Sequence, residues 1–105
     1  MCPKNNPKCG SIAASLEIIG DKWSGHIIRA LTAGPKRFGE LEQDLGIGPR
    51  TLSQRLECMA RDSIIVKQQI SEASPHAEYK LTKKGEDLLP ILRSMAAWDT
   101  KYSAH

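Results

Sequence analysis

The sequence predicts one mainly α-helical domain with a small β-hairpin, and three observations carry this prediction. Apolar residues recur at helical spacing through most of residues 11–62. The tripeptide "GIG" (46–48), followed by Pro49, interrupts that pattern with a tight turn. The period then shortens in "IIVKQQI" (64–70) and "AEYKLT" (77–82), which favours two short strands. Two helices joined by a short glycine-bearing turn and followed by a hairpin indicate a winged helix-turn-helix.

The chain is expected to begin with an arm and two short helices. Residues 1–10, "MCPKNNPKCG", have no apolar period and favour a flexible or extended arm. Ser11 is expected to cap a helix that ends at Gly20, with an inner stripe of Ile12, Leu16 and Ile19. Asp21 is expected to cap a second helix that closes at Gly34-Pro35 and carries Trp23, Ile27, Ala30 and Leu31 on one side.

The helix-turn-helix is expected over residues 37–62. Its first helix starts near Arg37 and buries Phe38, Leu41 and Leu45. Pro49 begins its second helix, where a missing N–H costs nothing, and that helix runs to about Asp62.

The wing is expected over residues 64–82 as a two-stranded hairpin around the polar turn "SEASPH". Thr82 is then expected to cap a last helix over residues 83–103. Its apolar stripe comprises Leu88, Ile91, Leu92, Met95 and Tyr102. Pro90 lies inside this stretch and predicts either a kink or an early break.

Composition limits the classes of protein that the chain can belong to. The 105 residues suffice for one small domain, and a net charge of +3 permits a polyanionic partner without requiring one. An odd count of three cysteines, with no secretory segment or membrane-spanning run, favours a cytoplasmic protein with free thiols. Neither paired carboxylates nor a phosphate loop nor a metal knuckle is evident. We therefore expect no enzyme, cofactor or metal.

The second helix of the helix-turn-helix is the candidate DNA-reading element. Helical projection places Leu52, Leu56 and Met59 on its core face, with polar side chains opposite. Its N-terminal half would enter the major groove, where arginine pairs with guanine and glutamine with adenine. The candidate contacts are Pro49, Arg50, Thr51, Ser53, Gln54 and Arg55. The alternative is an ordinary solvated helix face.

Further cations could hold the DNA backbone. Lys36 and Arg37 precede the first helix of the motif, while Lys67 and His76 lie on the wing. Solvated surface charges are the alternative interpretation for these side chains.

The chain resembles the HxlR-type winged-helix transcription regulators of bacteria and archaea. The matching stretches are "GDKWSGHIIRAL", "KRFGELEQDLGIGPRTLSQRLECM", "AEYKLTKKGEDLLPIL" and the closing "AAW", which together span about residues 9–98. The resemblance implies a cytoplasmic, nucleoid-associated homodimer that binds double-stranded DNA at an inverted repeat. It also implies an interface made by the first and last helices, with Ile12, Leu16, Leu88, Leu92 and Met95 as the candidate interface residues.

The resemblance also singles out Cys9, because family members often keep a cysteine shortly before the first helix and some use it to sense oxidants or electrophiles. Lys8 and a nearby helix N-terminus would favour its thiolate. The alternative is an unreactive thiol in the arm. The rival to DNA binding is a winged helix that serves only as a protein-interaction module.

Two departures from the family pattern affect the ends of the second helix. Gly48 stands where the family usually has serine, and it still caps acceptably. Ser63 stands where the family usually has glycine. It must adopt a left-handed conformation or end the helix in another way.

Overall fold

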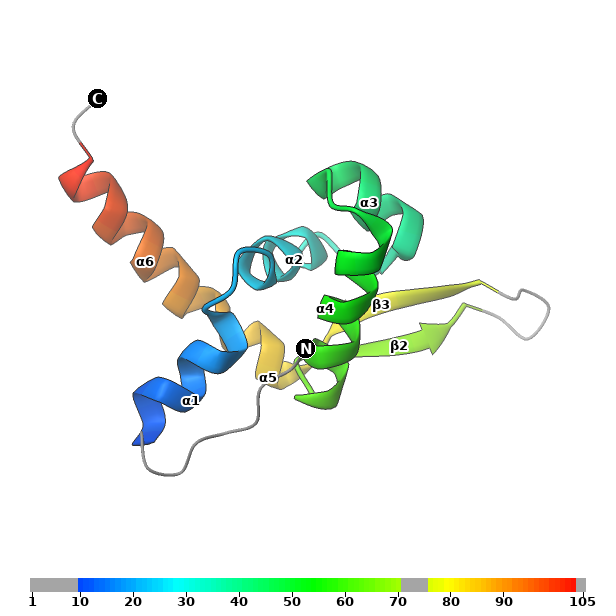
Figure 1. The fold of residues 1–105 in the computed structure, drawn as a ribbon, viewed down its shortest axis with the longest axis horizontal. Coiled ribbons are helices and arrows are strands. Elements are labelled where there is room, and N and C mark those ends of the chain that lie inside the picture. Colours follow the sequence, from blue (N-terminus) through cyan, green and yellow to red (C-terminus); the bar gives the residue numbers. More distant parts are fainter. Residues whose placement is uncertain (1–9, 71–75, 104–105) are drawn as a thin grey trace.

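The computed structural model describes residues 10–70 and 76–103, so residues 1–9 of the predicted arm, Cys9 among them, and the tip of the wing lie outside the described residues, while Gly10 belongs to the first helix and not to an arm. The elements run in the order α1 (Gly10–Ile19), α2 (Ser24–Leu31), β1 (Lys36–Arg37), α3 (Phe38–Leu45), α4 (Pro49–Arg61), β2 (Ile65–Gln69), β3 (Ala77–Leu81), α5 (Lys83–Glu86) and α6 (Leu89–Tyr102) (Figure 1). The predicted winged-helix class is confirmed. In the described part of the chain no helix is long and apolar enough to cross a membrane.

The hydrophobic core lies where α2, α3 and α4 meet the sheet. Helical spacing directs one face of each helix inward, so that aliphatic side chains far apart in the sequence pack together. The buried cluster comprises Ile27, Ile28, Leu31, Leu41, Ile47, Leu52, Leu56, Met59, Ile64, Ile65 and Leu81. The core face predicted for 49–62 is therefore correct.

The sheet has three strands, and the prediction of a two-stranded hairpin was incomplete. The order is β1-β3-β2, and β3 pairs antiparallel with both neighbours. Lys36 and Arg37 lie opposite Tyr79 and Glu78. A strand of two residues has no alternation that a sequence pattern could display, so this stretch was assigned to the start of a helix.

The start of α4 is formed as the sequence predicted, and its end takes one of the two alternatives left open for Ser63. Gly48 is its N-cap residue with extended backbone, and Pro49 occupies the first turn. At the other end Ser63 adopts a left-handed conformation with φ of 63°. The amide of Ser63 bonds to the carbonyl of Ala60, and that of Ile64 to the carbonyl of Met59. The strained residue thus lets the chain turn directly from α4 into β2.

The C-terminal helix predicted over 83–103 is divided into two helices, so the break and not the kink is the correct one of the two predicted alternatives. The Thr82 hydroxyl caps α5 by accepting a hydrogen bond from the Gly85 amide at 3.1 Å. The chain breaks after Glu86 and resumes as α6, with Pro90 in its first turn. This is the early break that Pro90 allowed, because proline is tolerated at the start of a helix and not inside one.

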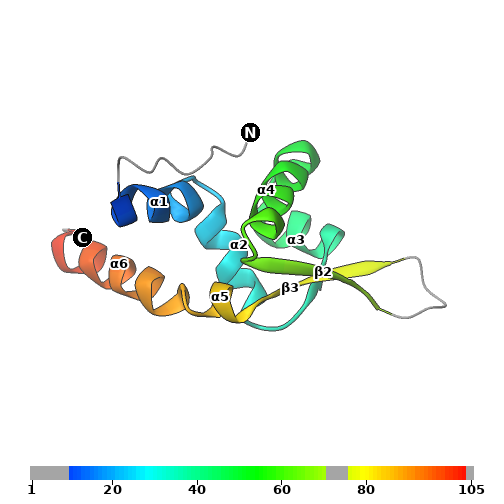
Figure 2. The same ribbon diagram turned by 90° about the horizontal axis from the view of Figure 1, so that it is seen from below.

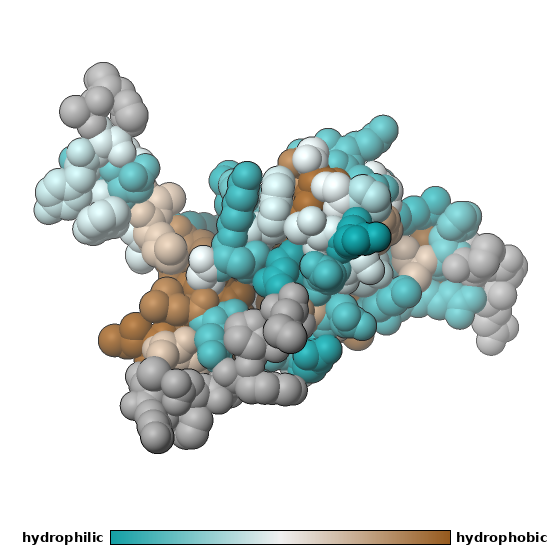
Figure 3. Space-filling model, in the orientation of Figure 1, coloured by the Kyte–Doolittle hydropathy of each residue, from teal (hydrophilic) through white to brown (hydrophobic). Residues whose placement is uncertain are grey.

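Helices α1 and α6 lie on the side opposite the wing in both views (Figures 1 and 2). α1 begins at Gly10, one residue before the predicted cap. Its predicted inner stripe does not pack inward: Ile12 is 77% exposed and Leu16 is 54% exposed. Hydrophobic surface gathers between α1 and α6 in Figure 3. Exposed apolar side chains on α6 are Ile91, Met95, Trp98 and Tyr102.

Candidate nucleic-acid interface

Helix α4 presents a polar face opposite its buried one. Leu52, Leu56 and Met59 anchor the helix in the core. Since successive residues turn by about 100°, the positions between these anchors must point outward. The predicted contacts Pro49, Arg50, Thr51, Ser53 and Gln54 are all exposed. The structure therefore places these five on accessible surface near the N-terminal end of α4.

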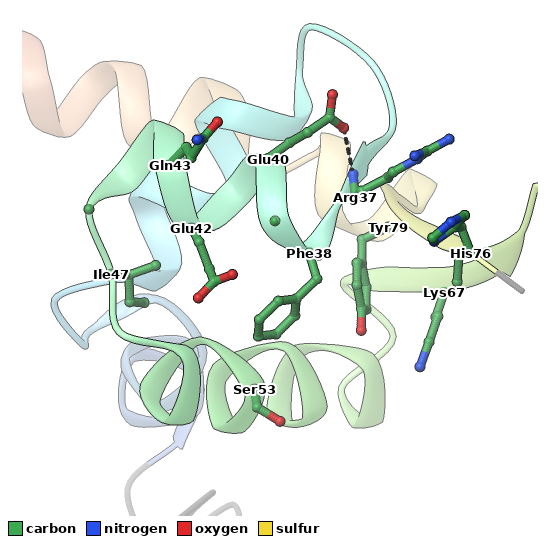
Figure 4. A pocket seen from close by; sticks show the side chains of 13 residues that line it. Arg37, Phe38, Glu40, Glu42, Gln43, Ile47, Ser53, Lys67, His76 and Tyr79 are labelled. Carbon is green, nitrogen blue, oxygen red and sulfur yellow. Dashed lines mark hydrogen bonds between the residues drawn. The ribbon is translucent and has the colours of Figure 1, made fainter.

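A groove of about 1170 Å³ lies between α3, α4 and the wing (Figure 4). The rings of Phe38 and Tyr79 lie inside it, while Ser53 contributes from α4. Arg37 and Lys67 supply basic groups from β1 and β2, and His76 supplies one from the end of the wing turn, directly before β3. Glu40, Glu42 and Gln43 line the α3 side. The groove therefore brings four of the predicted site residues, Arg37, Ser53, Lys67 and His76, to one surface.

The two aromatic rings in the groove were not predicted as site residues. Phe38 was assigned to the core, and it does pack partly against it. Tyr79 lies on the central strand β3, opposite Lys36 of β1 and Lys67 of β2, and the Lys67 ammonium lies 5.9 Å from its ring centroid. Strand alternation places Tyr79 on the same face as buried Leu81, with Lys80 between them, so the sequence pattern indicates a partly buried ring and gives no signal for a groove residue.

Two of the predicted DNA contacts, Lys36 and Arg55, already have carboxylate partners. Lys36 Nζ lies 3.3 Å from Asp44 Oδ2, with the lysine side chain 24% exposed. Arg37 is held through its backbone, because its amide donates to Glu40 Oε1 at 2.8 Å (Figure 4). The Arg37 side chain is thus left on the surface at the N-terminus of α3.

Arg55 is the second paired cation. Its Nη1 lies 3.5 Å from Asp21 Oδ1, and its side chain is only 15% exposed. Asp21 also accepts hydrogen bonds from the backbone amides of Trp23 at 3.0 Å and Ser24 at 3.3 Å, and from the Ser24 hydroxyl. The N-cap residue of α2, which starts at Ser24, is Trp23 and not the predicted Asp21; Asp21 instead accepts from the two amides at the entry to the helix.

The environment of Asp21 favours its ionised form. Burial by itself would raise the pKa of this carboxyl. The Ser24 hydroxyl, the Trp23 amide, the Arg55 guanidinium and the Ser24 amide together hold its pKa below the ordinary value of 3.8. The carboxylate is therefore charged at neutral pH and available to Arg55.

Cys58 lies on α4 and is buried, with 6% of its surface exposed. It is disulfide-bonded, so the expectation of free thiols is wrong for this residue. The chain's other cysteines, Cys2 and Cys9, lie outside the described residues. Arg55 Nη2 donates to the Cys58 sulfur at 3.5 Å. A disulfide thus lies one helical turn from the ion pair on the same helix.

The candidate interface residues divide into two groups. Ile12, Leu16 and Met95 are half or more exposed, whereas Leu88 and Leu92 pack partly against the core. Leu88 and Leu92 therefore hold α6 on the domain, while the other three side chains stay on the surface. Among the described residues, no group of three His, Cys, Asp or Glu side chains could hold a metal ion.

The fold and this surface define a winged helix-turn-helix of the DNA-binding class. The family model described as HxlR-like helix-turn-helix matches residues 18–105, and the chain belongs to that family. The family consists of transcriptional regulators, and the chain is a transcriptional regulator and not an enzyme.

Three similar proteins are matched along nearly their whole length. The regulatory protein MalR of Fusobacterium mortiferum is 39% identical over 90% of this chain and 91% of its own. The reduced form of the transcriptional regulator YodB from Bacillus subtilis superposes with a TM-score of 0.83 at 30% identity, over 90% of this chain and 93% of its own. The redox regulator HypR in its oxidised form gives 0.78 at 29% identity, over 90% and 98% respectively.

Proposed function

We propose that the protein is a homodimeric, sequence-specific DNA-binding regulator that acts on an inverted-repeat operator in the cytoplasm and responds to thiol oxidation. The observation that carries the DNA-binding part is the exposed polar N-terminal half of α4, held by a buried face beside a groove that Arg37, Lys67 and His76 line. In a helix-turn-helix this half of the second helix enters the major groove.

The side chains on this half of α4 suit base edges. The Arg50 guanidinium can donate two parallel hydrogen bonds to O6 and N7 of guanine. The Gln54 amide can pair with N6 and N7 of adenine, and the Thr51 methyl can contact the methyl group of thymine. Ser53 and the first turn at Pro49 then lie at the level of the backbone phosphates.

The groove between α4 and the wing suits the DNA backbone. Arg37, Lys67 and His76 line it, and Lys36 lies next to Arg37 on β1. Cations at a wing position the duplex by binding phosphates and carry no sequence information of their own. We assign these four residues to that role.

A second copy of the chain is the proposed occupant of the apolar surface on α1 and α6. Trp98 and Ile12 are 67% and 77% exposed, and Met95 is 50% exposed. A contiguous apolar surface of this kind is typical of an interface. Two-fold symmetry would place the two α4 helices about 34 Å apart, one turn of DNA, which requires an inverted repeat.

The proposed oxidant response rests on two supports. HypR and YodB are relatives whose structures are described by their oxidised, reduced, diamide-treated or quinone-bound states. In this chain Cys58 of α4 is in the disulfide state. Forming such a bond removes two electrons and two protons from two thiols, and an oxidant such as diamide accepts them. Cys9 remains the proposed sensor on grounds of resemblance.

DNA binding is tested by fluorescence anisotropy on DNA from the region upstream of the gene, at about 150 mM salt with scrambled competitor. We expect Arg50→Ala and Gln54→Ala each to weaken specific binding by about ten- to a hundredfold. Arg61→Ala, which removes the same charge from the exposed C-terminal end of α4, is the matched control and should change little. DNA affinity and salt slope that stay unchanged in Arg50→Ala and Gln54→Ala would contradict the assignment and favour a protein-interaction module.

The dimer interface is tested by sedimentation velocity. Met95→Glu buries a carboxylate in the proposed interface and should convert the dimer to monomer. Val66→Glu is the control, because Val66 is a similarly exposed apolar residue on β2. A monomeric wild-type protein would overturn the dimer proposal.

The redox response is tested by repeating the binding measurement after diamide treatment with the wild type, Cys9→Ser and Cys58→Ser. We expect oxidation to change the affinity of the wild type, and Cys9→Ser to abolish that change. Specific DNA binding whose affinity is unchanged by diamide would contradict the proposed oxidant response and leave the proposed DNA binding intact.

A further inference from the structure

Local hydrogen bonds orient the carboxylate of Asp21 independently of Arg55. Two backbone amides and the Ser24 hydroxyl donate to its oxygens, and Ser24 itself is buried. A carboxylate held by three donors has little rotational freedom left. Asp21 therefore offers its charge in one fixed direction, toward α4.

Arg55 meets this carboxylate from α4. It follows exposed Gln54 and precedes buried Leu56, so it lies at the border between the polar and the core faces. Its guanidinium touches both Asp21 Oδ1 and the Cys58 sulfur, at 3.5 Å in each case. Because the side chain is 15% exposed, leaving this position would expose Asp21 and break both contacts.

Asp21 stands at the corner between α1 and α2. The Gly20 amide closes α1 by bonding to the Leu16 carbonyl at 2.7 Å, and Asp21 follows directly. Adding a Cβ at Gly20 would bring it to 2.3 Å from that same carbonyl oxygen, so this corner is tightly closed. The ion pair therefore joins α4 to the end of α1 across 34 positions of sequence, from Asp21 to Arg55.

We propose that Arg55 is a positioning residue of the DNA-binding surface: through Asp21 it fixes the orientation of α4 relative to the α1–α2 corner, and it does not itself contact DNA. This inference rests on the proposed function. Because α1 also belongs to the proposed dimer interface, the same ion pair fixes how each α4 is set relative to the two-fold axis. This positioning role replaces the expectation that Arg55 binds the duplex.

A positioning role and a contact role predict opposite results for Asp21→Asn. Asparagine keeps an oxygen for the amides of Trp23 and Ser24 but removes the charge that holds Arg55. If Arg55 bound phosphate, freeing it would raise DNA affinity and steepen the salt dependence by about one counterion per protomer. If Arg55 positions α4, the variant loses specific affinity despite its added positive charge.

The test measures Kd for operator and for scrambled DNA between 50 and 300 mM salt, with the variants Asp21→Asn, Arg55→Gln and the double variant. Active protein is counted by stoichiometric titration, so that a partly unfolded sample does not appear as weaker binding. Arg61→Gln is the matched control for the lost arginine on α4. We expect each single variant to lose about tenfold in the ratio of specific to non-specific affinity, and the double variant to lose no more than either.

The salt slope should stay at the wild-type value in Arg55→Gln. A slope that falls by about 0.9 per protomer in Arg55→Gln, or an operator affinity that rises in Asp21→Asn, overturns the positioning role while leaving the proposed function intact. Wild-type protein with no preference for operator overturns both. If Arg55→Gln does not fold, Asp21→Asn alone decides between the two roles.

Discussion

Gly85→Ala tests how the wing is attached to the C-terminal helices. Gly85 is buried in α5, and a Cβ built there would lie 2.2 Å from the Ile64 carbonyl oxygen and 3.1 Å from Leu81 Cδ2. The Ile64 carbonyl cannot simply move away, because it accepts hydrogen bonds from the Thr82 amide at 3.0 Å and the Thr82 hydroxyl at 3.1 Å. The added methyl group must therefore separate α5 from the start of β2.

The free-energy cost follows from what is lost. Two hydrogen bonds contribute about 1 kcal/mol each. Overpacking a closed site adds about 1–3 kcal/mol. The free energy of unfolding should therefore fall by about 3–5 kcal/mol, a large part of the ~5–15 kcal/mol that stabilises a domain.

Urea unfolding followed by far-ultraviolet circular dichroism measures this loss as a lower midpoint. Gly39→Ala is the matched control, since a Cβ there meets nothing within 4 Å and the residue lies in α3. It should stabilise the protein by about 0.5–1 kcal/mol through helix propensity. A free energy of unfolding for Gly85→Ala within 1 kcal/mol of the wild-type value would refute the claim that the backbone of α5 at Gly85 lies directly against the Ile64 carbonyl.

Two further predictions concern backbone strain and pH. Ser63→Gly should raise the free energy of unfolding, measured by urea unfolding, by about 0.5–1 kcal/mol, because Ser63 has a φ of 63° that glycine adopts more easily. Gly46→Ala should lower it by about 1 kcal/mol, because Gly46 has a φ of 65° and the space around it is open. Since the pKa of Asp21 is lowered in the folded state, the stability it adds is present above its ordinary value of 3.8 and is lost as the pH falls through the lower folded value. The difference in unfolding free energy between wild type and Asp21→Asn should thus be constant above about pH 5 and shrink below about pH 4; a difference that grows in acid would contradict the sign.

The sequence predicted those parts of the fold that depend on local periodicity. The limits of α4 and its Pro49 start follow from residue types a few positions apart, whereas the left-handed Ser63 was one of two alternatives raised by the resemblance to a family that usually has glycine there. The strand β1 was missed because two residues show no period and are paired only through distant β3. The break between α5 and α6 remained one of two alternatives, since proline at 90 fits both a kink and a helix start.

The candidate site was less predictable, because side-chain partners far apart in the sequence decide its chemistry. The helical projection located Arg50, Gln54 and Arg55 relative to the core but carried no information about what lies beside them. Asp21 was expected to cap a helix, and its second role toward Arg55 depends on how α1 and α2 pack against α4. In the same way, Ile12 and Leu16 look like core residues until the fold leaves them on the surface.

These partners change the expected electrostatics of DNA binding. Arg37 and Lys67 form no ion pair with any carboxylate that the structure describes, whereas Lys36 and Arg55 are held by Asp44 and Asp21. If Lys36 exchanges Asp44 for phosphate while Arg55 keeps Asp21, the lysines and arginines assigned to phosphates neutralise six phosphates in a dimer, and log Kobs against log salt should have a slope of about −5. If Arg55 also leaves its carboxylate for phosphate, eight phosphates are neutralised and the slope approaches about −7. A titration of operator affinity between 50 and 300 mM salt distinguishes the two values, and the shallow slope is expected because Arg55 is too buried to exchange its partner.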